Sequence, residues 1–465
     1  MEYQNNKVKD LKISYIGGGS RGWAWTFMTD LALEPALSGT ICLYDLNKNA
    51  AVNNQIIGNR LYDREDTCGK WKYTVANDLK EALTGADFVI ISILPGTFDE
   101  MESDVHLPER LGIYQSVGDT AGPGGIVRAL RTIPMFVEIA EAVKAWAPEA
   151  WVINYTNPMS LCVKTLYHVF PEIKAFGCCH EVFGTQKLLK HITEESLGIK
   201  DIKREEIFVN VLGINHFTWF DQASYKGIDL FSVYRDYIDG HFEEGYHEND
   251  NNWANSMFDC HHRVKFDLFR KYGLIAAAGD RHLAEFMPGE EYLKEQETVK
   301  EWKFALTTVA WRKEDLKNRL IKSKKLVEGE DVELKPSGEE GILLIKALCG
   351  LERVISNVNI PNKDRQIKNL KEDDIVETNA VFERDSIRPI IAGELPEKVL
   401  NLITPHLENH ETVLKAALNC DESLVVKAFL NDPLVKGRAA EAEVAKLVKD
   451  MIAGTIKYLP KGWNK

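Results

Sequence analysis

Short apolar runs alternate with amphipathic stretches through residues 11–180. Buried strands are predicted at residues 12–16, 41–45, 88–93, 151–154 and 173–177. The spacing of apolar positions between them predicts helices at residues 23–34, 48–62 and 126–146. Strands that are hydrophobic on both faces and separated by helices are typical of a parallel sheet with helices on each side. We therefore expect an α/β domain of the Rossmann type over residues 1–198.

The rhythm of apolar positions changes after about residue 200. The further elements predicted are strands of a mixed sheet at 207–212 and 217–220, later strands between 358 and 392, helices over 291–326 and most of 396–458, and a loop or solvated face at 241–255. Strands and helices of this kind predict a second, mixed α/β domain over residues 199–465.

Composition narrows the class of protein. Hydrophobic residues make up 45% and charged residues 27% of the 465 residues, as in ordinary globular proteins. The formal net charge of −13 argues against a nucleic-acid partner, which needs a cationic surface. No apolar run reaches ~18 residues, so no membrane span is expected. The chain starts without the apolar core of a signal peptide, and its eight cysteines have no framework spacing, so reduced thiols in the cytoplasm are expected.

A glycine loop follows the first predicted strand and precedes the first predicted helix. It fits the pattern G-x-G-x-x-G with Gly17-Gly18-Gly19-Ser20-Arg21-Gly22. Glycines allow a tight turn and a close backbone approach, and the helix N-terminus then faces a pyrophosphate. Asp45 ends the next strand, where a carboxylate accepts hydrogen bonds from an adenosine ribose, which favours NAD over NADP. Ser92, at the end of the third strand, is expected beside the same cofactor. The alternative is a purely structural turn with an aspartate cap.

Polar residues also follow the later strands, at the sheet edge where open α/β sheets bind ligands. A Gly-rich loop at 118–125 is interpreted as a wall over the nicotinamide with Asp119 pointing inward, or else as a surface turn. Asn154 ends its strand and is a candidate ligand for substrate. Cys179 and His216 come from separate elements and could make half of a metal site. A buried thiol and a core histidine are the alternative.

Four ionisable groups lie within six residues in Gly279-Asp280-Arg281-His282-Leu283-Ala284-Glu285. This density fits a solvated helix start with Asp280 as its cap. It also fits a site contribution that combines a base, an arginine for an anion and carboxylates.

Together these segments resemble the NAD- and metal-dependent family 4 glycoside hydrolases. The resemblance spans nearly the whole chain and is carried by Ile16-Gly17-Gly18-Gly19-Ser20, Asp119 to Gly125, Asn154 to Pro158, Cys179-His180-Glu181-Val182, Asn215-His216, Gly279 to Glu285 and Asn359-Ile360-Pro361-Asn362. It implies a Rossmann domain of the lactate and malate dehydrogenase type. A tetrad that reads Cys-His-Glu-Val resembles the α-galacturonidase branch, whereas phospho-glycosidase members carry Asp or Asn where His180 stands.

The resemblance implies a role for each candidate. Cys179 and His216 would be ligands of a divalent metal, usually Mn²⁺. The catalytic candidates are His180 as acid, Asp280 as base, and Asp119. The substrate candidates are Asn154 for sugar hydroxyls, Glu181, and Arg281 for a uronate carboxylate, with Arg128 and Arg131 as further arginines. Family members often form dimers or tetramers, so a homo-oligomer is expected.

The expected reaction is hydrolysis of short α-D-galacturonides. The resemblance implies oxidation at C3 by NAD⁺, removal of the C2 proton, elimination of the C1 substituent, addition of water and re-reduction. Three alternatives stay open. One is another α-glycosidase of the family, acting on glucuronides, galactosides or glucosides. The others are an NAD-dependent dehydrogenase of a sugar or hydroxy acid, and a non-catalytic NAD sensor.

Overall fold

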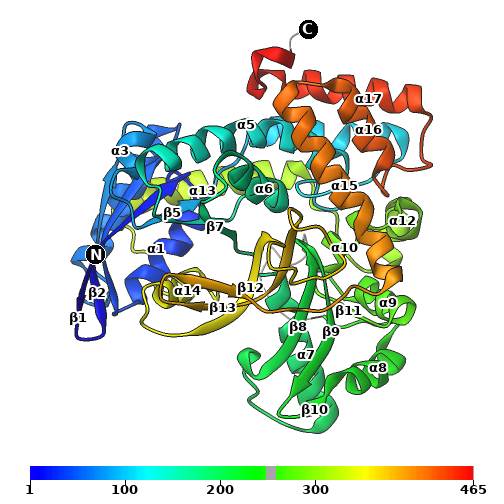
Figure 1. The fold of residues 1–465 in the computed structure, drawn as a ribbon, viewed down its shortest axis with the longest axis horizontal. Coiled ribbons are helices and arrows are strands. Elements are labelled where there is room, and N and C mark those ends of the chain that lie inside the picture. Colours follow the sequence, from blue (N-terminus) through cyan, green and yellow to red (C-terminus); the bar gives the residue numbers. More distant parts are fainter. Residues whose placement is uncertain (248–257, 464–465) are drawn as a thin grey trace.

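The computed structural model describes residues 1–247 and 258–463 (Figure 1). Its main sheet has ten strands in the order β14-β13-β12-β7-β6-β5-β2-β3-β4, with β1 paired to β2. These strands are β1 (Glu2–Gln4), β2 (Lys7–Ile16), β3 (Leu37–Tyr44), β4 (Trp71–Val75), β5 (Phe88–Ile91), β6 (Trp151–Asn154), β7 (Lys174–Gly177), β12 (Val354–Pro361), β13 (Ile375–Glu383) and β14 (Ser386–Pro389). The strands from β4 to β7 pair in parallel, which confirms the Rossmann-type fold class.

Helices connect and cover the parallel strands. They are α1 (Trp23–Leu33), α2 (Lys48–Asp63), α3 (Leu79–Leu83), α4 (Phe98–His106), α5 (Gly122–Trp146), α6 (Met159–Val169) and α7 (Glu181–Leu197). The short strand β5 is buried on both faces, as its unbroken apolar run requires. Helix α5 begins four residues before the predicted start at residue 126, because Pro123 sits in its first turn, where a missing N–H costs nothing. Half of the Gly-rich loop is therefore helical.

A smaller sheet lies below the first and is antiparallel throughout. It consists of β8 (Ile207–Ile214), β9 (Phe217–Tyr225), β10 (Ile228–Asp229) and β11 (Ile275–Ala276). Helices α7, α8 (Leu230–His241) and α9 (Arg263–Tyr272) share an apolar core with it. Ile214 pairs with Phe217, so Asn215 and His216 form the tight turn of the β8–β9 hairpin, with φ 61° at His216.

The remaining helices are α10 (Asp280–Phe286), α11 (Gly289–Tyr292), α12 (Gln296–Glu301), α13 (Val309–Glu328), α14 (Gly341–Leu348), α15 (Glu397–Asn419), α16 (Glu422–Asn431) and α17 (Glu441–Thr455). The single helix predicted over 291–326 is wrong. Lys303 and Ala305 hydrogen-bond to residues 259–261 instead of continuing a helix, and Thr308 then caps α13. Part of the loop predicted at 241–255 lies outside the described residues.

After the smaller sheet, the chain adds three more strands to the main sheet. Strand β12 pairs antiparallel with β7, and β13 and β14 continue from there. Helices α15 to α17, orange to red in Figure 1, pack over α5. Arg131 on α5 is fully buried between Asp104 of α4 and Thr455 of α17.

The division of the chain into two domains at residues 198 and 199 stays a prediction. No helix in the described ranges is both long and apolar enough to span a membrane.

Candidate functional site

The glycine loop packs tightly between the ends of β3 and β5. The N–H of Gly19 donates to Asp45 Oδ2 at 2.9 Å, and a Cβ on Gly19 would lie 2.6 Å from the Cβ of Ala50. A Cβ on Gly17 would lie 2.0 Å from the carbonyl oxygen of Ser92. Only glycine allows this approach. The loop leads into α1, whose first turn has no acidic residue and no side-chain cap, so its N–H groups fit a pyrophosphate. This cradle, with Asp45 at its rim, fits a dinucleotide.

The predicted metal ligands come from two turns. Cys179 is buried between β7 and α7, and its carbonyl accepts a hydrogen bond from Asn357 Nδ2 at 3.0 Å. His216 is buried at the tip of the β8–β9 hairpin, and its ring lies 3.9 Å from the ring of His282. Glu181, the first residue of α7, joins the two sides, because its Oε2 accepts the N–H of Gly279 at 2.7 Å.

Electrostatics tie these side chains into one group. His282 Nε2 lies 3.7 Å from Glu181 Oε1. Burial would raise the pKa of Glu181, but His282, His180 and His216 lower it well below its ordinary value. Burial, followed by the carboxylates of Glu377 and Glu181, raises the pKa of the Cys179 thiol well above its ordinary value. A thiolate at Cys179 therefore needs a cation beside it. The donor set of sulfur and imidazole fits a divalent metal.

A hydrogen-bond chain fixes the orientation of His216. Burial would raise the pKa of Asp119, but Arg128, His282, Arg312 and His216 lower it to about 2, so the carboxylate is ionised. Thr120 donates its only hydroxyl proton to Asp119 Oδ1 at 2.9 Å. Its oxygen must then accept from His216 Nδ1, 3.0 Å away. This leaves a lone pair on Nε2 of His216, as metal binding requires.

Replacing Thr120 with valine should therefore weaken divalent metal binding by about 10- to 100-fold, since the link that sets the His216 tautomer is lost. The affinity for Mn²⁺, measured from the signal of free Mn²⁺ in electron paramagnetic resonance, tests this. Thr120→Ser keeps the hydroxyl and should bind like the wild type. Wild-type affinity in the valine variant would refute the role of Thr120.

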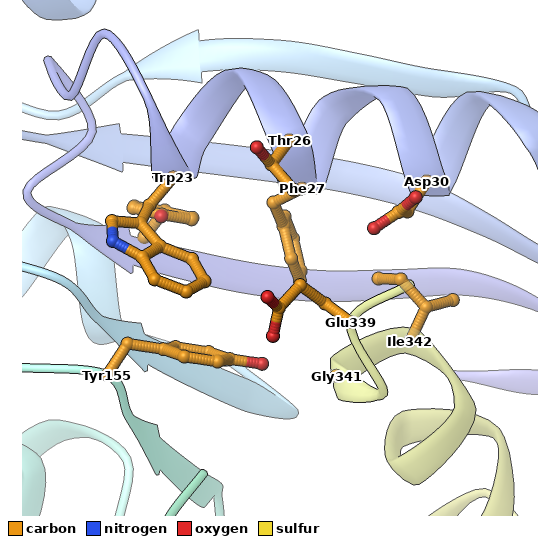
Figure 2. Close-up of a pocket in the computed structure, with 9 residues that line it drawn as sticks. Trp23, Thr26, Phe27, Asp30, Tyr155, Glu339, Gly341 and Ile342 are labelled. Atoms are coloured by element: carbon orange, nitrogen blue, oxygen red, sulfur yellow. The ribbon is translucent and has the colours of Figure 1, made fainter. Parts of the chain in front are cut away.

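His180 contacts Trp23 and Glu339, two of the residues that line a cleft between α1 and the start of α14. Figure 2 shows this cleft, with Trp23 and Tyr155 on one side and Glu339 facing them. The rings of Trp23 and Tyr155 stack at 5.3 Å, and Glu339 Oε1 lies 3.2 Å from His180 Nδ1. The hydrogen bond to Glu339 raises the pKa of His180 to about 9, against the opposing effect of burial. His180 is therefore protonated at neutral pH.

Asp280 faces the first turn of α9. Its two carboxylate oxygens accept the N–H groups of Val264 and Lys265, each at 3.1 Å. Burial raises the pKa of Asp280 to about 6, although Lys265 and these N–H groups act against it. Its nearest potential ligand partners are Cys260 and His262. Asp280 thus caps α9, although it is itself the first residue of α10.

Several predicted substrate residues have structural partners. The amide of Asn154 hydrogen-bonds twice to the backbone of Thr156, at 3.0 Å each. The guanidinium of Arg281 donates to the carbonyls of Ser116 and Ala305 and to Thr307. These contacts hold the loop that leads to Asp119.

The other two candidate arginines are also engaged, since Arg128 donates to the carbonyl of Asn157 and Arg131 to Asp104. Arg312 on α13 is different. Its Nε is buried with no hydrogen-bond partner within residues 1–247 and 258–463, and its charge acts on Asp119.

Sequence reasoning did not select Thr120, His282, Glu339 or Arg312. His282 lies in a segment already noted for its density of charge, which was a usable signal. Arg312 and Glu339 reach the site from segments without any motif, so only the fold brings them there.

Glu285 on α10 lies behind this site. Its Oε1 accepts the N–H groups of Val117 and Gly118 at 2.6 and 2.8 Å, whereas burial raises its pKa from 4.5 to about 8. The folded chain thus binds this proton more tightly than the unfolded chain, and the free energy of unfolding falls as pH rises from 4.5 to 8.

Glu285→Gln removes this titration. Between pH 6 and pH 8, the free energy of unfolding of the wild type should fall by about 1–2 kcal/mol relative to that of the variant. Denaturant unfolding at each pH measures both values. Parallel pH profiles for the two proteins would contradict this expectation.

Comparison with known proteins gives two kinds of match. The sequence model of the family 4 glycosyl hydrolases matches residues 12–195, and that of the family 4 glycosyl hydrolase C-terminal domain matches residues 211–435. An alpha-galacturonidase of Lachnoclostridium phytofermentans is 70% identical over 465 residues, which are 100% of both chains.

Solved structures agree with these matches. The crystal structure of a Bacillus subtilis protein described as a glucosidase covers 96% of this chain and 100% of its own, at 52% identity and a TM-score of 0.90. A 6-phospho-alpha-glucosidase from gut microorganisms, in complex with NAD and Mn²⁺, covers 97% of this chain and 99% of its own, at 17% identity and a TM-score of 0.79. The second likeness concerns the fold alone.

Proposed function

We propose that this chain, which belongs to family 4 of the glycosyl hydrolases, hydrolyses short α-D-galacturonides with the help of NAD and a divalent metal, preferably Mn²⁺. The observation that carries the proposal is the 70% identity, over complete lengths, with an alpha-galacturonidase. The tetrad Cys179-His180-Glu181-Val182 supports the same substrate class.

The cofactors would occupy two parts of the site. Gly17 to Gly22 and Asp45 would hold NAD, and Cys179 and His216 would hold the metal, with His282 next to them. When bound, NAD accepts and returns a hydride at sugar C3 while the metal polarises the neighbouring oxygens. The hydrogen-bond chain from Asp119 through Thr120 keeps His216 in the tautomer that can bind a cation.

Protons would be moved by two groups with shifted pKa values. His180, with a pKa of about 9, holds a proton at neutral pH and can give it to the departing oxygen at C1. Asp280 stays the proposed base for the C2 proton, and its pKa of about 6 puts its carboxylate in the range where proton transfer works near neutrality. To act, it has to exchange one of its hydrogen bonds with α9 for the substrate.

The carboxylate of a galacturonide needs a cationic partner. Arg281, Arg128 and Arg131 are engaged elsewhere, so we assign this role to Arg312. The buried Nε of Arg312 lacks a hydrogen-bond partner among the described residues, and a planar guanidinium matches a carboxylate bidentately. Glu181, held by Gly279, would orient sugar hydroxyls rather than meet the anion.

The decisive experiment is turnover in D₂O. Elimination after removal of the C2 proton should place deuterium at C2 of the released galacturonate. No NADH should accumulate at 340 nm during cleavage, because the hydride returns. Unlabelled product would refute elimination, and stoichiometric NADH would indicate a dehydrogenase instead.

All eight cysteines are free, which supports a reducing compartment such as the cytoplasm. A homo-oligomer, as dimer or tetramer, stays a prediction that sedimentation velocity tests.

A further inference from the structure

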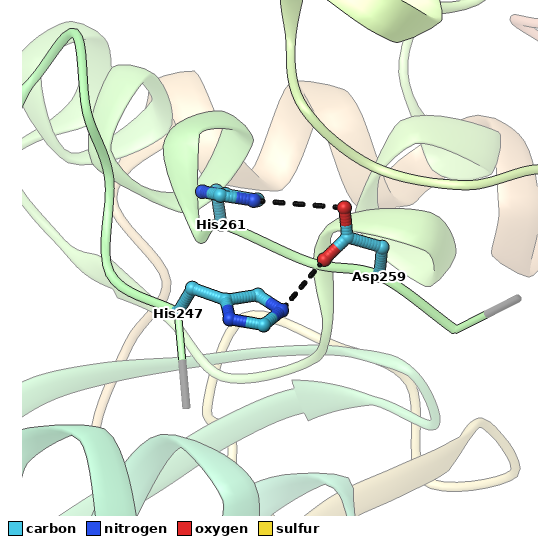
Figure 3. Close-up of side chains that lie close together, drawn as sticks. All are labelled: His247, Asp259 and His261. Carbon is cyan, nitrogen blue, oxygen red and sulfur yellow. Dashed lines mark ion pairs between the residues drawn. The ribbon is translucent and has the colours of Figure 1, made fainter. Parts of the chain in front are cut away.

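A second group of potential metal ligands lies between α8 and α9. It consists of His247, Asp259 and His261, whose ligand atoms all lie within 4.8 Å of one another. Figure 3 shows the two imidazoles turned toward opposite oxygens of the same carboxylate. His247 Nε2 lies 2.9 Å from Asp259 Oδ1, and His261 Nε2 lies 3.5 Å from Oδ2.

The backbone holds two of these residues in place. The segment 259–261 is extended and makes two hydrogen bonds to residues 303–305, from the N–H of Ala305 to the carbonyl of Asp259 and from the N–H of His261 to the carbonyl of Lys303. Side chains two residues apart on an extended segment share a face, so Asp259 and His261 point the same way. The N–H of Tyr246 donates to the carbonyl of His261, which brings the neighbouring His247 to the same face.

The hydrogen bonds of His261 suit a metal ligand. Its Nδ1 lies 3.2 Å from the carbonyl oxygen of Glu244, which can only accept, so Nδ1 carries the proton. In the neutral ring, Nε2 then has a lone pair that faces the carboxylate of Asp259. The neutral ring and the carboxylate can then hold a metal ion between them. A backbone carbonyl bound to the far nitrogen is also the usual support for a metal-binding histidine.

The carboxylate of Asp259 suits the same metal ion. Asp259 Oδ1 is buried, and no described residue gives it a hydrogen bond, although His247 Nε2 is close. A metal ion placed between the three side chains would satisfy this oxygen and both ring nitrogens at once. Two imidazoles and one carboxylate suit Zn²⁺ and bind it more tightly than Mn²⁺.

We propose that His247, Asp259 and His261 form a zinc-binding site that fixes the segment leading into α9. Water would complete the coordination of the ion. Cys260 and His262 alternate with the ligands and lie on the opposite face, within ligand distance of Asp280. The bound ion would therefore hold the backbone beside Asp280 without taking part in the reaction. This site is separate from the Cys179 and His216 pair and does not depend on the function proposed for that pair.

The test is zinc binding to the full-length protein supplied with NAD and Mn²⁺. After equilibrium dialysis against Zn²⁺, the metal content of the wild type should exceed that of Asp259→Asn and of His261→Ala by one zinc per chain. His106→Ala removes a histidine that pairs with Glu109 elsewhere, and it should retain the wild-type content. Equal zinc contents in the wild type, Asp259→Asn and His261→Ala would overturn the proposal and leave a simple ion pair.

X-ray absorption separates this zinc from any zinc that enters the Cys179 site. In a Cys179→Ser background, the zinc shell should contain nitrogen and oxygen neighbours, with imidazole scattering and no sulfur. Added Zn²⁺ should also raise the melting temperature of that protein, and Asp259→Asn should abolish the rise. A sulfur-containing shell, or a rise that survives in Asp259→Asn, would refute the site.

Discussion

Cys179→Ser is expected to lower kcat/KM by about 1,000-fold or more. The reason is that a metal acting as a Lewis acid contributes several kcal/mol to the transition state, and each 1.4 kcal/mol is a factor of ten. Serine is a poor substitute, since its hydroxyl stays protonated where a thiolate would bind. Activity on an aryl α-galacturonide over a range of Mn²⁺ concentrations measures the effect.

The neighbouring cysteine provides the matched control. Cys178 is equally buried, but it packs in the apolar core under the main sheet. Cys178→Ser should therefore retain metal-dependent activity within a few-fold, even if its stability falls. Full activity in Cys179→Ser, or an equal loss in both variants, would remove Cys179 from the metal site.

Arg312→Gln should lower kcat/KM for galacturonides by about 100-fold or more while it affects galactosides much less. The difference arises because only the uronate has a carboxylate for the guanidinium, and a buried charge-assisted pair is worth about 2–5 kcal/mol when one partner is removed. The ratio of kcat/KM for aryl α-galacturonide and aryl α-galactoside is the quantity to measure.

Two further variants sharpen this result. Arg312→Lys keeps the charge beside Asp119 but loses the planar fork, so it should recover only part of the galacturonide activity. Lys317→Ala removes an exposed cation from the same helix, one that pairs with Glu314, and should have no effect. An equal loss on both sugars in Arg312→Gln would show that Arg312 acts through Asp119 and not on the substrate.

Local patterns predicted the parts of the fold that depend on local sequence. Apolar runs such as Phe88 to Ile91 identified the parallel strands, because strands buried on both faces have no polar positions. The break at residues 303–305 was not predictable, since it arises from hydrogen bonds to residues 259–261, which lie far away in the chain. The return of β12 to the edge of β7 is equally non-local.

The candidate site divides in the same way. Cys179 and His216 were selected by residue type and by their place after apolar runs, and each lies at a turn beside a strand. The chain from Asp119 to His216 could not be predicted, because Thr120 and His216 meet across two separate elements. Asp280 was recognised as a possible cap, but its partner is α9, and only the packing of α9 against α10 reveals this.

The pairing of β12 with β7 has a consequence for biosynthesis. Strand β7 leaves the ribosome well before residues 354–361 are translated, so the nascent chain carries an open sheet edge during that interval. Unpaired edges are templates for association with other chains. We expect a fragment that ends at residue 198 to aggregate, and the enzyme to need chaperone protection until residues 354–361 have been synthesised.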